Sequence, residues 1–371
     1  MLQVVATLIL LSWLLALGRT VLNLLLLPRL RPGTPAPATG PFVSIVIPAR
    51  DEEQAIERTV RALLAQTYQP LEVIVVNDRS TDRTGDILGA IDDPRLIVIH
   101  GEVDPPAGWL GKPWALAQGS RRAKGELLLF IDADIHYAPE TVALAVAQQQ
   151  RSGASLVTLL PHFELRGFWE NVAMPQLAIV ALSFMPVWIA NRTTIPLLGI
   201  GGGPGNLVVR ADYDAAGGHE ALRDAIVDDV GLARLLRRAG RRTEVVLADD
   251  LVSLRMYHGL REVVEGFTKN LFATMGRSYA VAFFGLGAML AGHLLPYLLL
   301  FVPSVRAIAI ATVATITLLR VILFASLRYR LDNALFLHPL LVVVWTWIFL
   351  RSIWITGVRN ELQWRGRTYP R

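Results

Sequence analysis

Long apolar segments are the feature that most constrains this chain. Residues 2–27 are almost unbrokenly apolar, and three further apolar segments lie at 279–302, 306–327 and 334–356. Each approaches or exceeds the roughly 20 residues that a helix needs to cross a bilayer. Only 18% of the residues are charged, against roughly 25% in ordinary soluble proteins. We therefore expect an integral membrane protein of the cell membrane that also has a soluble part.

The N-terminal apolar segment is expected to be a retained anchor over residues 1–30. A cleaved signal peptide is the alternative, but the segment has no basic residues ahead of it and exceeds the usual apolar stretch of about 7–15 residues. A C-terminal membrane region is expected over 278–356, followed by a basic tail over 357–371. Four spans with a cytoplasmic domain would place that tail outside, which the positive-inside tendency disfavours, so three and four spans both stay open.

Residues 168–190 form a further apolar stretch, interrupted by Glu170, Asn171, Gln176 and two prolines. This mixture favours a helix that lies at the membrane interface rather than one that spans the bilayer. The alternative is that the stretch folds as part of the core of the soluble domain.

Charge and cysteine content exclude several classes of function. The chain has a formal net charge of +5 and no cysteine. Disulfides, cysteine-based zinc sites and thiol catalysis are therefore excluded. The basic residues are not interleaved with aromatic residues in a nucleic-acid-reading module, and we expect no nucleic-acid partner. They are instead expected to face anionic lipid headgroups or a phosphorylated substrate.

Between residues 42 and 275 short strand-like runs alternate with helical ones. We expect strands over 43–47, 71–76, 95–99 and 126–131, and helices over 52–66, 81–91 and 114–123. Such alternation predicts an α/β domain with a mainly parallel sheet.

Acidic residues follow three of these strands. Residues 48–53 follow the first, residues 77–80 the second, and Asp132-Ala133-Asp134 the strand over 126–131. Ligands of open parallel sheets bind outside the carboxyl ends of the strands, and clustered carboxylates need a cation or hydrogen-bond donors beside them. Asp132 and Asp134 suit Mg²⁺ or Mn²⁺ bound together with a phosphate group.

The ordered motifs resemble those of family 2 glycosyltransferases over roughly residues 42–275. The matching residues are Pro48-Ala49-Arg50-Asp51-Glu52, Asn77-Asp78-Arg79-Ser80, Gly111-Lys112, Asp132-Ala133-Asp134 and Asp228-Asp229. The resemblance implies a nucleotide-sugar-binding domain of the GT-A fold and a reaction that inverts the anomeric carbon. Among lipid-modifying members, the chain is similar to the hopanoid-associated and carotenoid-glycosylating kinds.

The resemblance also implies roles for individual residues. The donor side comprises Ala49, Arg50, Glu52, Asp78, Lys112 and Asp132. Asp132 and Asp134 would hold Mg²⁺ or Mn²⁺, which would neutralise the leaving diphosphate. Asp51 stands where many members have Asn, which leaves its own contact undefined.

Asp229 is expected to be the catalytic base. An inverting transfer needs a carboxylate that removes a proton from the acceptor as its oxygen attacks, and Asp229 takes the base position of the family's Glu-Asp-x-x-Leu helix start. The alternative is that Asp228 and Asp229 only favour the first turn of a helix through its dipole.

Other residues are expected on the acceptor side. The glycine-rich segment 201–206 predicts close backbone approach to a ligand, with ordinary turn formation as the alternative. The residues assigned to this side are Gly203, Asn206, Asp228, His219 and Tyr257. A lone loop histidine such as His219 is more often structural than catalytic.

Arg255 is the one residue retained from the Gln-x-x-Arg-Trp motif of processive and ceramide-type relatives, because Val252 and Met256 replace Gln and Trp. Arg255 is expected to pair with the departing diphosphate, since a guanidinium fits phosphate geometry. The missing Gln and Trp favour transfer of a single sugar over polymer synthesis.

The sequence thus predicts a glycosyltransferase that moves one sugar from a nucleotide-diphosphate-sugar to a membrane lipid or polyisoprenoid-type acceptor, with its catalytic domain on the cytoplasmic side. A metal-dependent nucleotidyltransferase and a noncatalytic glycosyltransferase-like membrane scaffold are the alternatives.

Overall fold

The computed structural model describes residues 1–359, 362–364 and 367–369, and its contacts divide the chain into two compact units. The sheet unit comprises Leu27–Glu164 and Val187–Met256. The helical unit comprises Met1–Leu26, Leu165–Pro186 and Tyr257–Arg371. Residues 360, 361, 365, 366, 370 and 371 of the expected basic tail lie outside the described residues.

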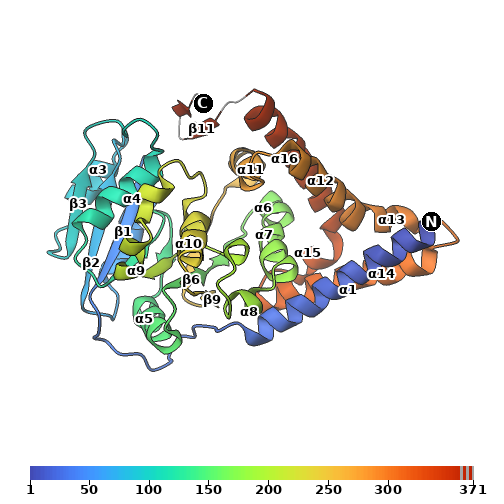
Figure 1. The fold of residues 1–371 in the computed structure, drawn as a ribbon, viewed down its shortest axis with the longest axis horizontal. Helices are drawn as coiled ribbons and strands as arrows, with labels where there is room; N and C mark the ends of the chain where they lie inside the picture. The colour runs from blue at the N-terminus through green and yellow to red at the C-terminus, as the bar shows by residue number, and fades with distance from the viewer. Residues whose placement is uncertain (360–361, 365–366, 370–371) are drawn as a thin grey trace. The chain divides into compact units, whose positions relative to one another are not determined.

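The sheet unit is built on a seven-stranded sheet in the order β3-β2-β1-β4-β8-β6-β9 (Figure 1). The strands are β1 (Val43–Ala49), β2 (Leu71–Asn77), β3 (Leu96–His100), β4 (Leu127–Phe130), β6 (Leu156–Leu160), β8 (Asn206–Val209) and β9 (Thr243–Leu247). Only β8 runs antiparallel to its neighbours. The expected mainly parallel sheet is confirmed.

A smaller sheet and short helices complete this unit. The smaller sheet has the order β5-β10-β7 and is formed by β5 (His136–Tyr137), β10 (Val252–Leu254) and β7 (His162–Phe163). The helices are α2 (Ile56–Leu64), α3 (Thr84–Gly89), α4 (Gly111–Arg122), α5 (Thr141–Ser152), α8 (Val187–Ala190), η2 (Pro196–Leu198), α9 (Arg210–Ala215), η3 (Gly218–Leu222) and α10 (Asp228–Arg238).

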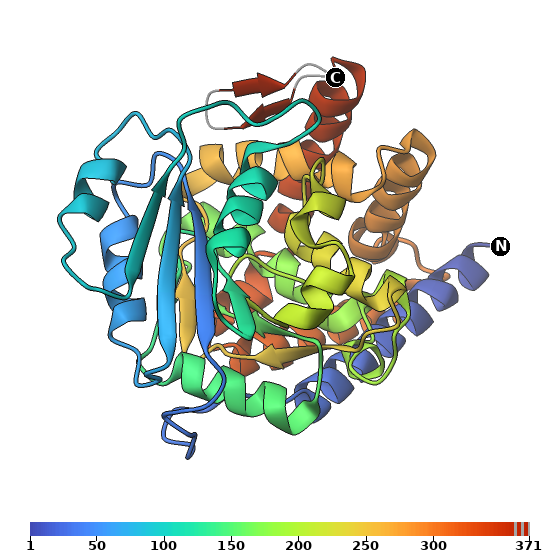
Figure 2. The ribbon, with the colours of Figure 1, turned by 60° about the vertical axis from the view of Figure 1, so that its left-hand side comes forward.

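The large sheet is covered on both faces, which explains why its strands are mostly apolar. Ile45 and Ile47 of β1 pack in one core cluster with residues of α2, α3 and α5. Val46, which points to the opposite face, packs in a second cluster with residues of α4 and α10. Figure 2 shows this layered arrangement around the sheet. Because a strand buried on both sides has no solvent face, its sequence shows no polar alternation.

The strand register brings the carboxyl ends of β1, β2 and β3 to one edge of the sheet. Ala49 pairs with Asn77, and Asn77 pairs with His100. In β4, Phe130 pairs with Val46, and Ile131 N then donates to Val46 O at 3.2 Å. The chain beyond Ile131 therefore enters the same edge beside the end of β1.

The helical unit contains four helices that are long and apolar enough to cross a membrane among the described residues: Leu2–Leu26, Tyr279–Leu299, Arg306–Ser326 and His338–Val358. Its elements are α1 (Leu2–Leu26), α6 (Phe168–Ala173), α7 (Pro175–Ile179), η1 (Val180–Phe184), α11 (Gly259–Thr274), α12 (Tyr279–Met289), η4 (Leu290–Leu294), α13 (Leu295–Leu299), α14 (Arg306–Ser326), α15 (Leu331–Phe336), α16 (His338–Ser352), η5 (Ile353–Val358), β11 (Leu362–Trp364) and β12 (Arg367–Tyr369). By length and composition, four rather than three candidate spans are present.

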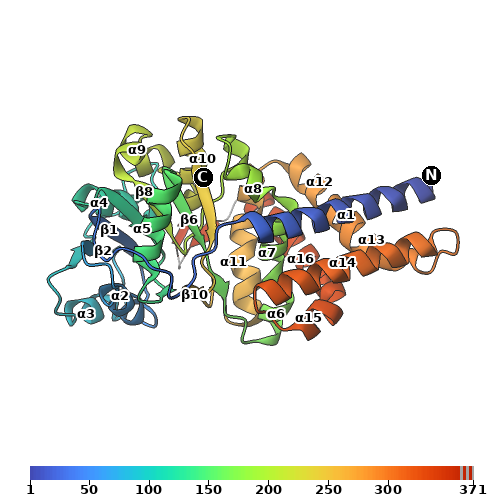
Figure 3. The same cartoon turned by 90° about the horizontal axis from the view of Figure 1, so that it is seen from below.

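Helix α1 packs along α14, as Figure 1 and Figure 3 show. Its polar residue Asn23 is satisfied by the segment α6–η1, because Asn23 Nδ2 donates to Leu182 O and Met185 O at 2.8 Å. The apolar stretch 168–190 is therefore divided, with α6, α7 and η1 in the helical unit and α8 in the sheet unit. That this stretch lies at a membrane interface stays a prediction.

Candidate active site

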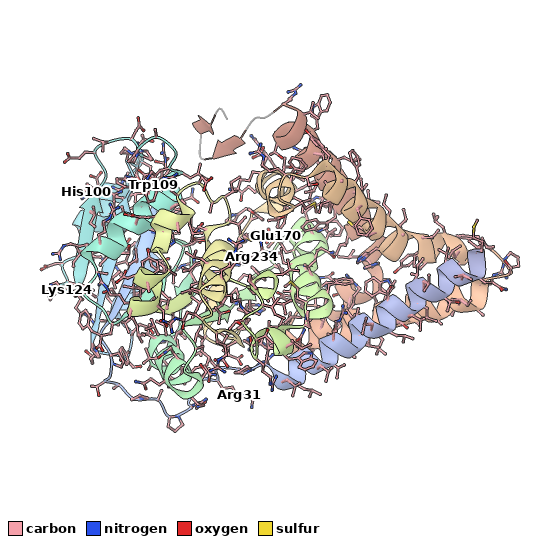
Figure 4. All side chains as sticks on the ribbon, in the orientation of Figure 1. Arg31, His100, Trp109, Lys124, Glu170 and Arg234 are labelled. Atoms are coloured by element: carbon pink, nitrogen blue, oxygen red, sulfur yellow. The ribbon has the colours of Figure 1, made fainter. Side chains whose placement is uncertain are left out.

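The candidate site is at the edge of the large sheet where the parallel strands end. Figure 4 places His100 and Trp109 at this edge, and Lys124, which precedes β4, toward the opposite one. Of the residues expected on the donor side, Arg50, Glu52, Asp78 and Asp132 lie in the loops after β1, β2 and β4, Ala49 ends β1, Lys112 lies in α4, and Arg255 follows β10.

The loops after β1 and β2 are tied to each other by side chains. Asp51 N donates to Ser80 Oγ at 3.0 Å, Thr81 N donates to Asp51 Oδ1 at 2.7 Å, and Glu52 N donates to Thr84 Oγ1 at 2.8 Å. Asp51 takes a φ of 52°, a left-handed conformation that Asp and Asn adopt more readily than most residues. An Asn at this position offers the same acceptor oxygen, so Asp51 meets the same local requirement.

Arg50 and Asp78 face each other across these loops with unsatisfied polar atoms. Arg50 Nη1 lies 3.8 Å from Asp78 Oδ2, beyond hydrogen-bond distance. Arg50 Nε and Nη1 and Asp78 Oδ2 are buried without a hydrogen-bond partner in the described part of the chain. The second oxygen, Asp78 Oδ1, accepts from Arg79. Because buried polar groups are nearly always satisfied, these atoms leave unused hydrogen-bonding capacity at this edge.

Lys112 brings the next motifs together from the first turn of α4. Its Nζ lies 2.8 Å from Asp132 Oδ1 and 3.4 Å from Asp228 Oδ1. Burial lowers the pKa of Lys112, but the charges of Asp132, Asp228 and Asp229 outweigh it and raise that pKa well above its usual value. Three motifs that are far apart in the sequence thus converge on one ammonium group.

Asp228 is the buried member of this cluster. Burial raises its pKa to about 6, and the charges of Asp229 and Asp132 add to the increase while Lys112 opposes it. Asp229, the next residue, is half-buried, and its Oδ1 accepts from Val230 N at 2.7 Å in the first turn of α10.

The glycine-rich loop packs directly against these carboxylates. Asp132 N donates to Gly203 O at 2.9 Å, and a Cβ on Gly203 would lie 1.9 Å from Asp132 Oδ2. A Cβ on Gly201 would lie 2.0 Å from the backbone oxygen of Asp229. Any side chain at either position would displace one of the two acids. Asn206 is buried in the same loop and accepts from Thr158 Oγ1 at 2.9 Å.

The residues present fit a divalent cation held with a phosphate-bearing ligand. Asp132 and Asp134 follow β4, and both are half-buried rather than enclosed. Among the described residues no group of three or more acids or histidines could hold a metal alone. Mg²⁺ needs no such group, because it is commonly bound by one or two carboxylates plus substrate phosphates.

His219 has a buried environment. Its side chain is 2% exposed, its Nδ1 lies 2.8 Å from Tyr213 Oη, and its ring packs edge-on against Phe130. Burial, with a smaller effect of the Lys112 charge, lowers its pKa to about 3. His219 is therefore neutral at physiological pH.

Two other expected residues lie on different elements. Arg255 directly follows β10 in the sheet unit. Tyr257 belongs to the helical unit, where its ring packs edge-on against Phe267 of α11 at 5.3 Å.

Two residues at this edge had been given no role from the sequence. Arg79, with a φ of 54°, pairs with both Asp78 and Asp104. The sequence signal for Arg79 is its position next to Asp78 in the motif Asn77-Asp78-Arg79-Ser80. Gly201 packs closely against the Asp229 backbone. The sequence gives no signal that distinguishes it from the other glycines of the loop.

Known proteins resemble this chain in sequence and in fold. Residues 44–190 match the model of the family described as glycosyl transferase family 2. The 4,4'-diaponeurosporenoate glycosyltransferases of Staphylococcus aureus strains MRSA252 and USA300 are each 27% identical over 337 residues, covering 88% of this chain and 88% of theirs. A mannosyltransferase from Pyrobaculum calidifontis, solved with GDP-Man and Mn²⁺, has the same fold, with a TM-score of 0.54, 20% identity, and coverage of 97% of this chain and 99% of that one.

Proposed function

Since the chain is a glycosyltransferase that carries a family 2 domain of the GT-A fold, we propose that it moves a single sugar, with inversion, from a nucleotide-diphosphate-sugar to a membrane lipid. The observation that carries this proposal is the convergence of Lys112, Asp132 and Asp228, with Asp229 adjacent, at the carboxyl end of β4. The acceptor is of the carotenoid or polyisoprenoid type.

The donor side lies along the loops after β1, β2 and β4. The unsatisfied atoms of Arg50 and Asp78 would bind the polar groups of the nucleotide, with Ala49 and Glu52 beside them. Lys112 would bind the diphosphate, because an ammonium group forms charge-assisted hydrogen bonds with phosphate oxygens. Arg255 would add a second cation to the departing diphosphate.

Asp132 and Asp134 would hold Mg²⁺ or Mn²⁺ on the donor. Bound there, the cation would supply Lewis-acid neutralisation of the diphosphate. Both carboxylates follow the buried strand β4 and are only half-buried, so they can reach a cation bound with the donor.

Asp229 would act as the base. Its carboxylate takes the proton from the acceptor hydroxyl while the acceptor oxygen bonds to the anomeric carbon and the bond from that carbon to the diphosphate breaks. The products are the glycosylated lipid, the nucleoside diphosphate and a proton. The Gly201–Asn206 loop, which contacts Asp132 and the Asp229 backbone, would border the acceptor, with Asp228 beside it.

A lipid acceptor is favoured by the relatives and by the membrane helices. The Staphylococcus aureus relatives are named for a carotenoid acid and span most of this chain, and four helices here could cross a membrane. With four spans, the C-terminal ends of Leu2–Leu26 and Arg306–Ser326 and the N-terminal ends of the other two lie on the side of the membrane that the sheet unit occupies. The arginines near these ends are Arg29, Arg31, Arg277, Arg328 and Arg330. An equal number of arginines, Arg306, Arg359, Arg365, Arg367 and Arg371, follows or precedes the opposite ends in the sequence, so the arginine distribution favours neither orientation, and a cytoplasmic catalytic domain stays a prediction.

The test uses purified full-length protein, Mn²⁺ or Mg²⁺, and a panel of radiolabelled nucleotide-sugars with membrane lipid extracts. The expected result is label in the lipid phase and release of the nucleoside diphosphate, with an anomeric configuration opposite to that of the donor by NMR. Release of pyrophosphate would instead identify a nucleotidyltransferase. Absence of any transfer, with lipids unchanged on gene deletion, would support a scaffold.

A further inference from the structure

The helical unit buries a cation that no acid among the described residues neutralises. Arg320 of α14 is 1% exposed and lies inside the candidate span Arg306–Ser326. Its Nε donates to Ala334 O at 2.9 Å and its Nη2 to Asn333 O at 2.8 Å. Its Nη1 is buried with no hydrogen-bond partner, and no carboxylate pairs with it, among the described residues.

Two buried histidines accompany this arginine. His293 is 5% exposed and His338 is 1% exposed. Their rings stack with centroids 5.2 Å apart, and His293 Nδ1 lies 3.4 Å from His338 Nε2. The positive charge of Arg320 acts on both rings. The remaining nitrogen, His338 Nδ1, is buried without a hydrogen-bond partner in the described part of the chain.

Aromatic rings and an irregular helix surround the pair. Trp13 packs edge-on against His293 at 4.8 Å, and Tyr297 stacks on His338 at 5.9 Å. His293 lies in the π-helical segment η4, and Trp13 Nε1 donates to Gly292 O of that segment at 2.9 Å. Single π-helical turns within α-helices occur often at functional sites.

A purely structural role accounts for part of this arrangement. Two of the Arg320 nitrogens hold the carbonyls of α15, and that contact would fix α15 against α14. It does not account for the third nitrogen, Arg320 Nη1, or for the facing histidines with an unused Nδ1. An uncompensated charge within a membrane span is costly, and such residues usually mark a functional site.

We propose that Arg320, His293 and His338 form a binding site for the anionic oxygen group of a lipid, either a carboxylate or a phosphate. A guanidinium binds both groups through charge-assisted hydrogen bonds, and the imidazole rings offer additional donors. The apolar helices around the cluster suit the hydrocarbon part of the same molecule. The assignment concerns binding and stands independently of sugar transfer.

Native mass spectrometry of the delipidated full-length protein tests this site with two matched pairs of probes. Oleate is compared with methyl oleate, and phosphatidic acid with diacylglycerol, so that each pair differs in the anionic group. One equivalent of an anionic probe is expected to remain bound in preference to its neutral counterpart. Preference for oleate alone identifies a carboxylate lipid, and preference for phosphatidic acid alone identifies a phosphate lipid.

Three variants locate the binding. Arg320→Gln is expected to weaken retention of the anionic probe about tenfold or more, because it removes the charged donor. His338→Phe keeps an aromatic ring but removes both nitrogens, and is expected to weaken retention less. Arg306→Gln, on the same helix but with an exposed side-chain contact, is the matched control and should bind as the unaltered protein does.

Equal retention of anionic and neutral probes by the unaltered protein would overturn the proposal. So would wild-type retention by Arg320→Gln and His338→Phe. If Arg320→Gln does not fold, His338→Phe decides the outcome. No sugar donor is present in this assay, so its failure rejects the lipid site alone, whereas failure of labelled transfer rejects the proposed enzymatic function alone.

Discussion

The two units of this chain handle buried charge in opposite ways. At the edge of the sheet unit, the Lys112 ammonium lies among acids, 2.8 Å from Asp132 Oδ1 and 3.4 Å from Asp228 Oδ1. In the helical unit, the Arg320 guanidinium is buried against two backbone carbonyls and lies over the Phe324 ring, without an acid beside it among the described residues. The first charge is compensated by carboxylates of the protein, whereas for the second we propose that an anionic ligand supplies the compensating charge. Both follow from the cost of an isolated buried charge.

The largest expected effect is a loss of sugar transfer without a loss of lipid binding. Asp229→Asn should lower the rate of transfer by about 10²–10⁴-fold, because the amide cannot accept the acceptor proton. The substituted side chain can still accept from Val230 N, so the first turn of α10 should persist. Transfer assays at saturating donor measure the effect.

The control for this change is Asp224→Asn, which alters an exposed acid near the start of α10 and should leave transfer intact. Retention of anionic lipid by Asp229→Asn should equal that of the unaltered protein. Undiminished transfer by Asp229→Asn would show that Asp229 is not the catalytic base.

The same chemical change made in each unit tests the comparison directly. Lys112→Gln leaves Asp132 and the buried Asp228 without their cation, and should cost about 2 kcal/mol of stability and most of the donor affinity. Arg320→Gln removes an uncompensated charge while keeping one donor group, and should cost less or even stabilise the lipid-free protein. Melting temperatures of the delipidated full chains compare the two. A larger loss for Arg320→Gln would show that both cations are structural.

Two adjacent glycines distinguish close packing from ordinary turn formation. Gly201→Ala would place a Cβ 2.0 Å from the Asp229 backbone oxygen, and should cost about 1–3 kcal/mol through overpacking together with a loss of transfer. Gly202→Ala meets only Pro204 Cδ at 3.3 Å and should be nearly neutral. Thermal unfolding and transfer are measured for both. Similar behaviour of the two variants would argue that the loop only turns the chain.

The last expected effect is a dependence of stability on pH. The pKa of Asp228 is raised by burial from 3.8 to about 6 in the folded chain. The folded state therefore keeps a proton that the unfolded state has lost. Between about pH 4 and pH 6 this group should lower stability as pH rises, by up to about 1.4 kcal/mol per pH unit.

Asp228→Asn removes the titrating group and should flatten this part of the profile. Unfolding midpoints measured from pH 4 to pH 7 for both proteins give the difference, with Asp224→Asn as the control. An unchanged slope in Asp228→Asn would mean that Lys112 keeps Asp228 ionised throughout.

Much of the fold was predictable because its signals are local. The strands Val43–Ala49 and Leu71–Asn77 are mostly apolar, with Ser44 and Glu72 as interruptions, and are followed by acidic motifs; buried parallel strands show such near-continuous apolar runs. The four candidate membrane helices were equally visible from length and hydropathy. The alternation of strands and helices also predicts that Asp78 and Asp132 lie at one edge of the sheet.

Partners distant in the sequence were not predictable in the same way. Nothing near Lys112 indicates that Asp228 will lie 3.4 Å from it, or that Asp51 will bind the Thr81 backbone. His219 stood in a glycine-rich segment typical of an exposed loop, and the structure buries it against Phe130 and Tyr213. Its environment depends on residues from other elements.

The mainly parallel sheet, the candidate membrane helices and the family resemblance can be predicted from the sequence, because periodicity, hydropathy and motif order are properties of neighbouring residues. The tertiary structure, in contrast, fixes which charges meet. It placed Lys112 among Asp132 and Asp228 and left Arg320 beside His293 and His338 without an acid among the described residues. The physical reason is that charge compensation depends on distances of a few ångströms between segments far apart in the chain.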